Sequence, residues 1–219
     1  MLNCSIQQVC CILTKRGFMF ITFEGCEGVG KSTQIKFLEE YLKDTNQDAL
    51  FLREPGGTII SEKIRSIILD INNKELSAEA EALLYASSRA QLLREKIIPA
   101  LENDRLVFCD RYIDSSIAYQ AYARNLGVGF VKKINSFALS YMPDYTVFID
   151  LPPQNSFRTV KTIDRLEQEN LNFHMNVYKG FCEIGKDDPK RFIFIRPSDD
   201  KHETSKIIID ELIKRKVIK

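Results

Sequence analysis

One segment constrains this chain more than any other: residues 25–32 read GCEGVGKS, which matches the pattern G-x-x-x-x-G-K-[ST]. Glycines at these positions permit the backbone angles that turn successive N–H groups around an anionic phosphate. The lysine of the pattern reaches the outer phosphates of a nucleotide, and the hydroxyl after it binds Mg²⁺. A chain of this length and average composition contains such a string by chance about once in a hundred. The pattern therefore predicts a phosphate loop, which requires a strand before it and a helix after it.

The surrounding sequence supplies both elements. Residues 18–23 (FMFITF) form a short apolar run of the kind expected in a buried strand. After the loop, Ile35, Leu38 and Leu42 recur at the spacing of one helical face. The positive end of this helix's dipole would point at the bound phosphates.

The rest of the chain alternates in the same way. Further strands are predicted at 49–52, 106–109, 145–149 and 191–195, and helices at 59–69, 78–101, 130–139, 166–184 and 202–215. Strands that are apolar throughout and separated by helices indicate a parallel sheet covered on both faces. We therefore predict a P-loop α/β fold, a three-layer α/β/α domain with a five-stranded parallel sheet over residues 18–219.

Charge and hydropathy exclude several classes of protein. The 219 residues include 31 basic and 30 acidic side chains, so the chain lacks the basic footprint of a duplex-DNA binder, and no nucleic-acid partner is expected. No run approaches the roughly 18 apolar residues of a membrane helix, so no membrane partner is expected. A hydrophobic content of 44% argues against a disordered chain.

The ends and the rare residues bear on location. In residues 1–17 the charges of Lys15 and Arg16 follow the apolar stretch, which is the reverse of a secretion signal. We interpret this stretch as a loosely ordered extension, or as an upstream start codon chosen in place of Met19. The six cysteines show neither C-x-x-C nor zinc spacing, which favours reduced thiols in the cytoplasm. His174 and His202 are expected at the surface.

A phosphate loop alone does not separate kinases, GTPases and motor ATPases. A GTPase needs a guanine-reading N-K-x-D string. The nearest match, NNKE at 72–75, has Glu where Asp is required and follows a predicted helix, so the sequence disfavours a GTPase.

Four further strings narrow the choice. They are REPGGT at 53–58, YASSR at 85–89, DRYIDSSIAYQ at 110–120 and DRLE at 164–167. Together with FEGCEGVGKST at 23–33, their order and spacing resemble the thymidylate kinase family, the dTMP kinases of the nucleoside-monophosphate kinase group. The resemblance runs from about residue 18 to the closing helix.

This resemblance implies Mg²⁺-dependent phosphoryl transfer from ATP to dTMP, giving ADP and dTDP for dTTP synthesis. It also implies a homodimer and a short lid segment at about residues 152–165 within the kinase domain. The acceptor is already an anionic phosphate oxygen, so no side-chain general base is needed. Catalysis would then rest on positioning and on positive charge.

The resemblance also assigns the ATP and metal sites. The expected ATP-binding residues are Gly25, Cys26, Glu27, Gly28, Val29, Gly30, Lys31, Ser32 and Thr33. Asp110 closes a strand at its carboxyl end, where α/β folds bind ligands, and would hold Mg²⁺ or its waters together with Ser32. Because the loop contains no arginine, the lid is expected to supply basic charge from Arg158, Lys161 and Arg165, chiefly from Arg165. The expected catalytic set is Lys31, Arg111, Arg158 and Arg165.

The family pattern places the dTMP phosphate against Arg53, Arg65 and Arg111, whose guanidinium forks suit phosphate geometry. Tyr119 would crowd the 2′ position and favour deoxyribose. Glu27 would accept a hydrogen bond from the sugar 3′-OH.

The same pattern places the base. Tyr85 falls where the family stacks an aromatic ring on thymine, a position that is more usually Phe. Arg89 lies four residues on, on the same helical face, and would donate to thymine O4 and reject cytosine. Ser116 and Gln120 match positions that contact the base.

Two alternatives stay open. One is a kinase of another pyrimidine nucleotide or of thymidine; the lack of an added general base counts against thymidine, and Arg89 counts against dCMP. The other is a nucleotide-binding regulatory protein without turnover. Intact Lys31, Ser32, Asp110 and Arg111 count against that class.

Overall fold

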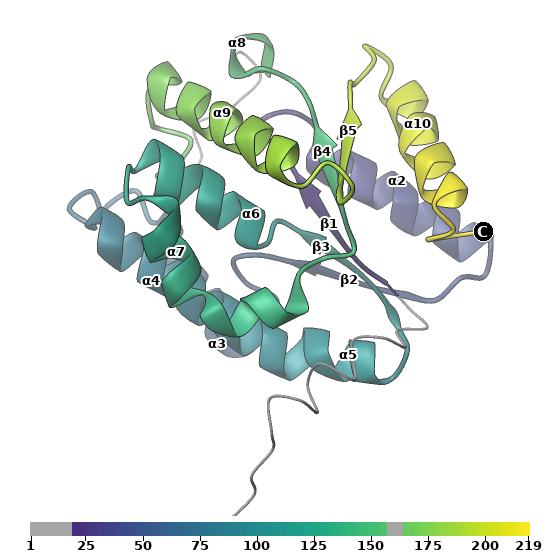
Figure 1. Cartoon of the computed structure of the whole chain (residues 1–219), viewed down its shortest axis with the longest axis horizontal. Helices are drawn as coiled ribbons and strands as arrows, with labels where there is room; N and C mark the ends of the chain where they lie inside the picture. The colour runs from purple at the N-terminus through teal and green to yellow at the C-terminus, as the bar shows by residue number, and fades with distance from the viewer. Residues whose placement is uncertain (1–18, 157–163) are drawn as a thin grey trace, which may run out of the picture.

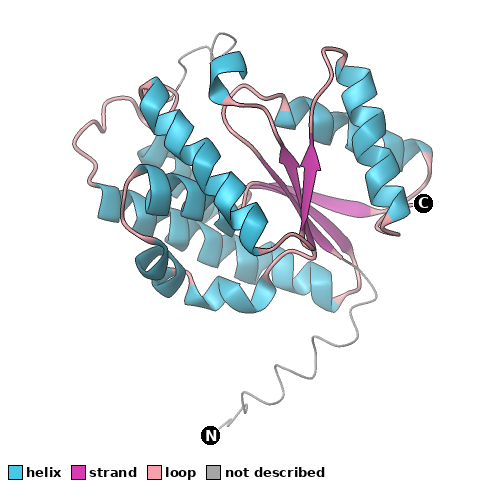
Figure 2. Ribbon diagram, turned by 45° about the horizontal axis from the view of Figure 1, so that its top comes forward, coloured by secondary structure: helices cyan, strands magenta, loops and turns pink. Residues whose placement is uncertain are grey.

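The computed structural model of the chain describes residues 19–156 and 164–219. Its sheet has five parallel strands in the order β2-β3-β1-β4-β5. The strands are β1 (Phe20–Glu24), β2 (Ala49–Arg53), β3 (Leu106–Asp110), β4 (Tyr145–Ile149) and β5 (Phe192–Ile195). Helices cover both faces of the sheet (Figures 1 and 2), so the predicted three-layer fold is confirmed. No described helix is long and apolar enough to span a membrane.

The strand order sets where a ligand can bind. From β1 the chain first builds β2 and β3 on one side of it and then β4 and β5 on the other. In parallel sheets the ligand crevice lies outside the carboxyl ends of the strands where this order reverses. The loops after β1 and β3 meet there, because the two strands pair in register from Phe20 with Val107 to Phe23 with Asp110.

The described helices agree with the predicted ones in most positions. They are α2 (Lys31–Asp44), α3 (Ile59–Leu69), α4 (Ala78–Leu92), α5 (Ile98–Glu102), α6 (Ile113–Ser116), α7 (Val128–Ile134), α8 (Pro153–Ser156), α9 (Leu171–Asp187) and α10 (Lys201–Lys214). Two π-helical segments, η1 (Leu93–Ile97) and η2 (Ile117–Ala123), and one 3₁₀ segment, η3 (Ser136–Tyr141), complete the set.

Three helix boundaries differ from prediction. The helix expected at 78–101 is interrupted by η1, which ends two residues before Pro99, a residue with no N–H to continue the α-helical ladder. The helix expected at 166–184 begins only at Leu171, because the Asn170 side chain caps it by accepting from the Phe173 N–H at 3.0 Å. The segment 130–139 is divided between α7 and η3.

Sequence reasoning missed the helical stretch from α6 through η2. This stretch is buried on nearly every side, and its buried positions include the polar Asp114, Ser116 and Gln120. A helix that is buried on all sides has no apolar stripe of period 3.6, so its sequence carries no periodic signal that predicts a helix. The stretch packs on α9, and a Cβ on Gly180 of α9 would lie 2.9 Å from the Ala118 Cα, so only glycine permits this close approach.

The two histidines behave differently. The prediction of a surface position is wrong for His174, which is 1% exposed. It lies on the same buried stripe of α9 as Val177 and Phe181, at the spacing of a core-facing position. His202 is exposed, as predicted, and stacks on Phe37 with 4.7 Å between ring centroids.

The remaining predictions concern the cysteines, the N-terminal extension and the lid. Among the described residues, Cys26, Cys109 and Cys182 are free cysteines, and the reduced state of the thiols stays a prediction. The N-terminal extension, residues 1–17, and residues 157–163 of the predicted lid lie outside the described residues, and both segments stay predictions. The described start of the lid region is the short helix α8.

Candidate functional site

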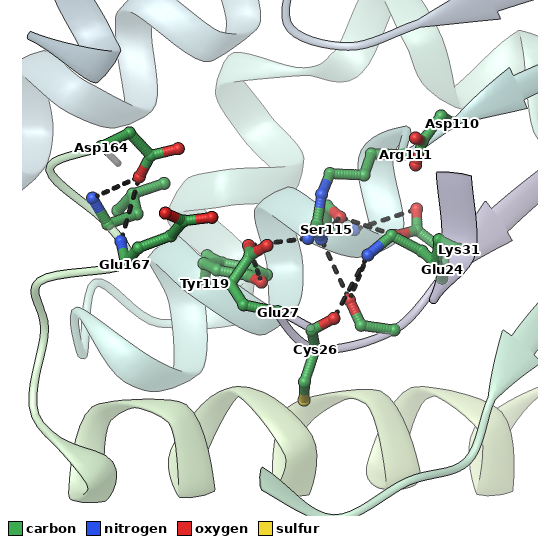
Figure 3. Close-up of polar contacts among 12 residues, drawn as sticks. Glu24, Cys26, Glu27, Lys31, Asp110, Arg111, Ser115, Tyr119, Asp164 and Glu167 are labelled. Carbon is green, nitrogen blue, oxygen red and sulfur yellow. Dashed lines mark hydrogen bonds and ion pairs between the residues drawn. The ribbon is translucent and has the colours of Figure 1, made fainter. Parts of the chain in front are cut away.

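The phosphate loop connects β1 to α2, as its motif requires. Gly28 and Gly30 have φ angles of 73° and 88°, in the left-handed region that favours glycine. Lys31 begins α2, and its side chain is buried. Its Nζ donates to the carbonyl oxygens of Gly25 at 3.1 Å and Cys26 at 3.2 Å, so the ammonium group lies inside the loop (Figure 3).

Asp110 lies at the carboxyl end of β3, beside the start of α2. The Ser32 hydroxyl donates to Asp110 Oδ2 at 3.5 Å. The other oxygen, Oδ1, is buried and accepts no hydrogen bond from the described residues. A carboxylate with a spare oxygen beside a hydroxyl is a donor set that suits Mg²⁺, which binds one or two carboxylates and takes its other ligands from phosphates and water. The described residues contain no larger cluster of metal ligands.

Arg111, Glu27 and Tyr119 meet at one carboxylate oxygen (Figure 3). Arg111 Nη2 lies 2.7 Å from Glu27 Oε1, and the Tyr119 hydroxyl donates to the same oxygen at 2.8 Å. Arg111 Nη1 also donates to the Gly25 carbonyl and the Ser115 hydroxyl, both at 3.1 Å. Burial alone would raise the pKa of Glu27, but the charges of Arg111 and Lys31 lower it to about 2. Glu27 is therefore ionised at neutral pH.

Sequence reasoning missed Glu24, which holds the loop after β3 in place. Its Oε1 accepts from the backbone N–H of Tyr112 at 2.8 Å, and its Oε2 accepts from the Ser115 hydroxyl at 2.6 Å. Burial raises the Glu24 pKa to about 8, with Asp114 adding to the rise. The available signal was a single acidic residue at the end of an otherwise apolar strand.

A cavity adjoins the phosphate loop. Its lining contains six of the residues expected to bind dTMP, together with Ser115 and Leu166. The six are Glu27, Tyr85, Arg111, Ser116, Tyr119 and Gln120. They come from the phosphate loop, α4, the loop after β3, α6 and η2, so the tertiary structure brings distant motifs into one space.

The other three residues expected at dTMP do not line this cavity. Arg89 is buried, with Nη2 2.7 Å from Glu54 Oε2 and Nη1 donating to Asn135 Oδ1 at 2.6 Å. Arg53 Nη2 lies 3.0 Å from both oxygens of Glu62. Arg65 Nη1 donates to the Pro55 carbonyl at 2.9 Å. Their roles stay predictions.

Arg165, expected to be the main catalytic residue of the lid, is buried against α4. Its Nη2 lies 2.5 Å from Glu81 Oε2, and its Nε donates to the Ile68 carbonyl at 2.9 Å. The turn that directs it inward is closed by Asp164 Oδ1, which accepts from the Leu166 N–H at 2.9 Å. Arg158 and Lys161 lie outside the described residues. Sequence reasoning also missed Glu81, although it lies four residues before Tyr85 on the same helical face.

Comparisons with known proteins point to one family. The family model described as "Thymidylate kinase" matches residues 23–208. The thymidylate kinase of Thermoanaerobacter pseudethanolicus is 50% identical over 194 residues, covering 87% of this chain and 95% of the relative. That of Acholeplasma laidlawii is 48% identical over 202 residues, covering 90% and 100%. The crystal structure of thymidylate kinase from Ehrlichia chaffeensis superposes with a TM-score of 0.75 at 30% identity, covering 90% and 99%.

Proposed function

This chain belongs to the thymidylate kinase family, and from that premise we propose that its phosphate loop holds ATP and that the adjoining cavity holds dTMP. As a thymidylate kinase it transfers a phosphoryl group from ATP to dTMP, giving ADP and dTDP. The observation that carries the site assignment is that the cavity and the loop share Glu27, while Arg111 of the cavity wall bonds the loop at Gly25. The two substrates would therefore meet at Arg111.

The donor side follows from the loop geometry. The loop N–H groups and the N-terminus of α2 present partial positive charge to the ATP phosphates. Lys31 Nζ already lies within the loop and would exchange its carbonyl contacts at Gly25 and Cys26 for the outer phosphate oxygens. A buried ammonium attracts phosphate more strongly than an exposed one, because the local dielectric constant is low.

We propose that the divalent cation which such kinases use is Mg²⁺, held by Asp110 and Ser32. The support is the spare, buried Asp110 Oδ1 beside the Ser32 hydroxyl. When bound, the ion supplies positive charge that neutralises the donor phosphates. The protein's part is to hold the Asp110 carboxyl group in place at the end of β3.

The acceptor side uses the cavity. Ionised Glu27 would accept from the sugar 3′-OH, and the Tyr119 ring limits the space beside it. Tyr85, Ser116 and Gln120 would surround the base. Arg111 would hold the acceptor phosphate in line with the donor, with its guanidinium fixed by Glu27, Gly25 and Ser115. Catalysis is then positioning plus charge, without proton abstraction.

We also propose that the chain acts as a homodimer through α3 and α4. These helices pack on each other and expose large apolar side chains. Ile59 is 79% exposed, Ile60 50% and Ile67 46% on α3, and Leu83 is 50% exposed on α4. Several large apolar side chains exposed on two helices that pack together are typical of an interaction surface. Sedimentation of the Ile60→Asp variant at half the native mass would support this face, and an unchanged mass would contradict it.

We also propose a cytoplasmic location, because the described cysteines are free.

The test of the proposed function is ADP release by the purified protein, with dTMP, dUMP, dCMP, UMP, AMP and thymidine as parallel acceptors. We expect strong preference for dTMP with Mg²⁺ present and no turnover in EDTA. Preference for another acceptor would contradict the base-site assignment. A folded protein that binds ATP but turns over no acceptor would favour a regulatory nucleotide-binding protein.

A further inference from the structure

Glu81 lies behind the wall of the proposed base site and is 0% exposed. Its Oε1 accepts from Gln120 Nε2 at 2.9 Å and from Arg124 Nε at 3.3 Å. Its Oε2 accepts from Arg124 Nη2 at 3.1 Å and from Arg165 Nη2 at 2.5 Å. Gln120 lines the cavity, and Glu81 does not. Of the three side chains that donate hydrogen bonds to Glu81, Gln120 is the one that lines the cavity.

The charge of Glu81 is secured by its neighbours. Burial alone would raise its pKa, but the positive charge and hydrogen bonds of Arg124 hold the pKa below its ordinary value, with further hydrogen bonds from Gln120 and Arg165. Arg124 is itself held from its other side by Glu169, at 2.6 Å. Glu81 is therefore an ionised carboxylate, which accepts hydrogen bonds and donates none.

This charge decides how the Gln120 side chain is turned. A glutamine amide has a donor NH₂ on one side and an acceptor oxygen on the other, and its two orientations differ little in shape. Beside an acceptor-only carboxylate, only the orientation that gives the NH₂ to Glu81 forms a hydrogen bond. The carbonyl oxygen of Gln120 is then turned away from Glu81. The reverse orientation would place two acceptors in contact in a buried site, which is costly.

The orientation matters because pyrimidines differ at N3. Thymine and uracil carry a hydrogen on N3 and donate there, whereas cytosine has a lone pair on N3 and accepts. We propose that Glu81 is the positioning residue for base specificity: it holds the Gln120 amide so that its carbonyl oxygen, and not its NH₂, meets N3 of the base. This inference rests on the proposed assignment of the cavity to dTMP.

The same contacts account for Arg124 and Arg165. A buried carboxylate without cationic partners would become protonated. A protonated Glu81 could donate a hydrogen bond to Gln120, and the Gln120 amide could then adopt either orientation. Two guanidinium groups prevent that by stabilising the charge. Arg165 therefore serves the base site indirectly, by keeping Glu81 ionised.

The test is the Glu81→Gln variant, assayed with dTMP and dCMP. Its carbonyl oxygen is expected to stay with the two guanidinium donors at the Oε2 position, so its NH₂ faces Gln120. Gln120 must then turn its carbonyl toward residue 81 and its NH₂ toward the base. We expect kcat/KM for dTMP to fall about 30-fold, mainly through KM, while that for dCMP holds or rises, so that the preference for dTMP falls at least about 30-fold.

The matched control is Glu169→Gln, the same chemical change on the far side of Arg124. It leaves the Glu81–Gln120 contact in place, so the preference is expected to stay within about twofold. If Glu81→Gln lowers dTMP and dCMP turnover in parallel, or acts on kcat alone, Glu81 has only a structural role and the inference is overturned.

A double variant, Glu81→Gln with Gln120→Glu, exchanges the two side chains. Here position 81 donates and position 120 is an acceptor-only carboxylate, so dTMP preference is expected to return to within about tenfold of the native enzyme. Circular dichroism and thermal unfolding confirm folding of each variant. If the single variant does not fold, the exchanged pair decides: retained dTMP preference supports the inference, and lost preference overturns it. A native enzyme that does not use dTMP would instead refute the proposed function itself.

Discussion

Replacing Arg111 by lysine keeps the positive charge and removes the guanidinium fork. Arg111 uses Nη1 for the Gly25 carbonyl and the Ser115 hydroxyl, and Nη2 for Glu27. A single ammonium is a point charge on a flexible stem and cannot span both sides. The variant therefore separates the need for charge from the need for a fixed, forked donor.

The magnitude follows from the lost contacts. Each hydrogen bond to a charged group contributes about 1.5–3 kcal/mol, and lysine retains at most the contact to Glu27. Losing one or two such contacts in the transition state raises the barrier by about 3 kcal/mol, which is about 100-fold in kcat/KM. A coupled assay of ADP release, with dTMP and ATP varied in turn, measures this. Activity within about fivefold of the native enzyme would refute the reasoning, because charge alone would then suffice.

The chain offers a matched control on the same strand. Arg105 stands directly before β3, and Arg111 directly after it. Arg105 is 41% exposed and pairs with Asp48 at 2.8 Å, and both residues directly precede a strand, at the opposite end of the strands from the site. Arg105→Lys is expected to change turnover less than about twofold, since exposed ion pairs contribute little.

Three further predictions address the loop, the buried arginine and the pH dependence of stability. Lys31→Ala is expected to lower turnover more than about 100-fold in the ADP assay, through loss of a positioned charge; surviving turnover would contradict the phosphate-loop assignment. Arg89→Ala is expected to raise KM for dTMP far more than KM for ATP, and to cost about 3–5 kcal/mol in urea unfolding, because Glu54 loses its buried partner; equal effects on both KM values would remove Arg89 from base recognition. Glu24 has its pKa raised from 4.5 to about 8 by burial and by Asp114, so the folded protein keeps a proton that the unfolded chain releases. The free energy of unfolding should therefore fall as pH rises from about 4.5 to 8, and Glu24→Gln should flatten that dependence; an unchanged slope would show that Glu24 is not its source.

Much of the fold was predictable from the sequence because short-range physics sets it. The central strands β1, β3 and β4 read as apolar runs because they are buried nearly throughout. The predicted span of β4 agrees with the structure residue for residue. The phosphate loop is local as well, because glycine angles and the following helix suffice to display its N–H groups. The helical stretch at 113–123 escaped detection for the opposite reason, since complete burial erases the periodic signal.

The residues of the candidate site were likewise predictable only where a local sequence pattern marks them. Motifs located Lys31, Arg111 and Asp110, because each follows directly from a strand end or a loop pattern. They did not locate Glu24 or Glu81, whose importance depends on partners far along the chain.

The sequence by itself therefore determined the layer order, the phosphate loop and the family of this chain. Only the tertiary structure decided which buried charges meet. Residue spacing does not indicate which arginine pairs with Glu81. In the structure, α4 packs against η2 and against the turn before α9, and this packing brings Arg124 and Arg165 to Glu81. Backbone conformation depends on neighbours in sequence, whereas a buried hydrogen bond depends on neighbours in space that are 39 residues apart for Glu81 and Gln120. The proposed orientation of the Gln120 amide toward the base therefore depends on the tertiary structure.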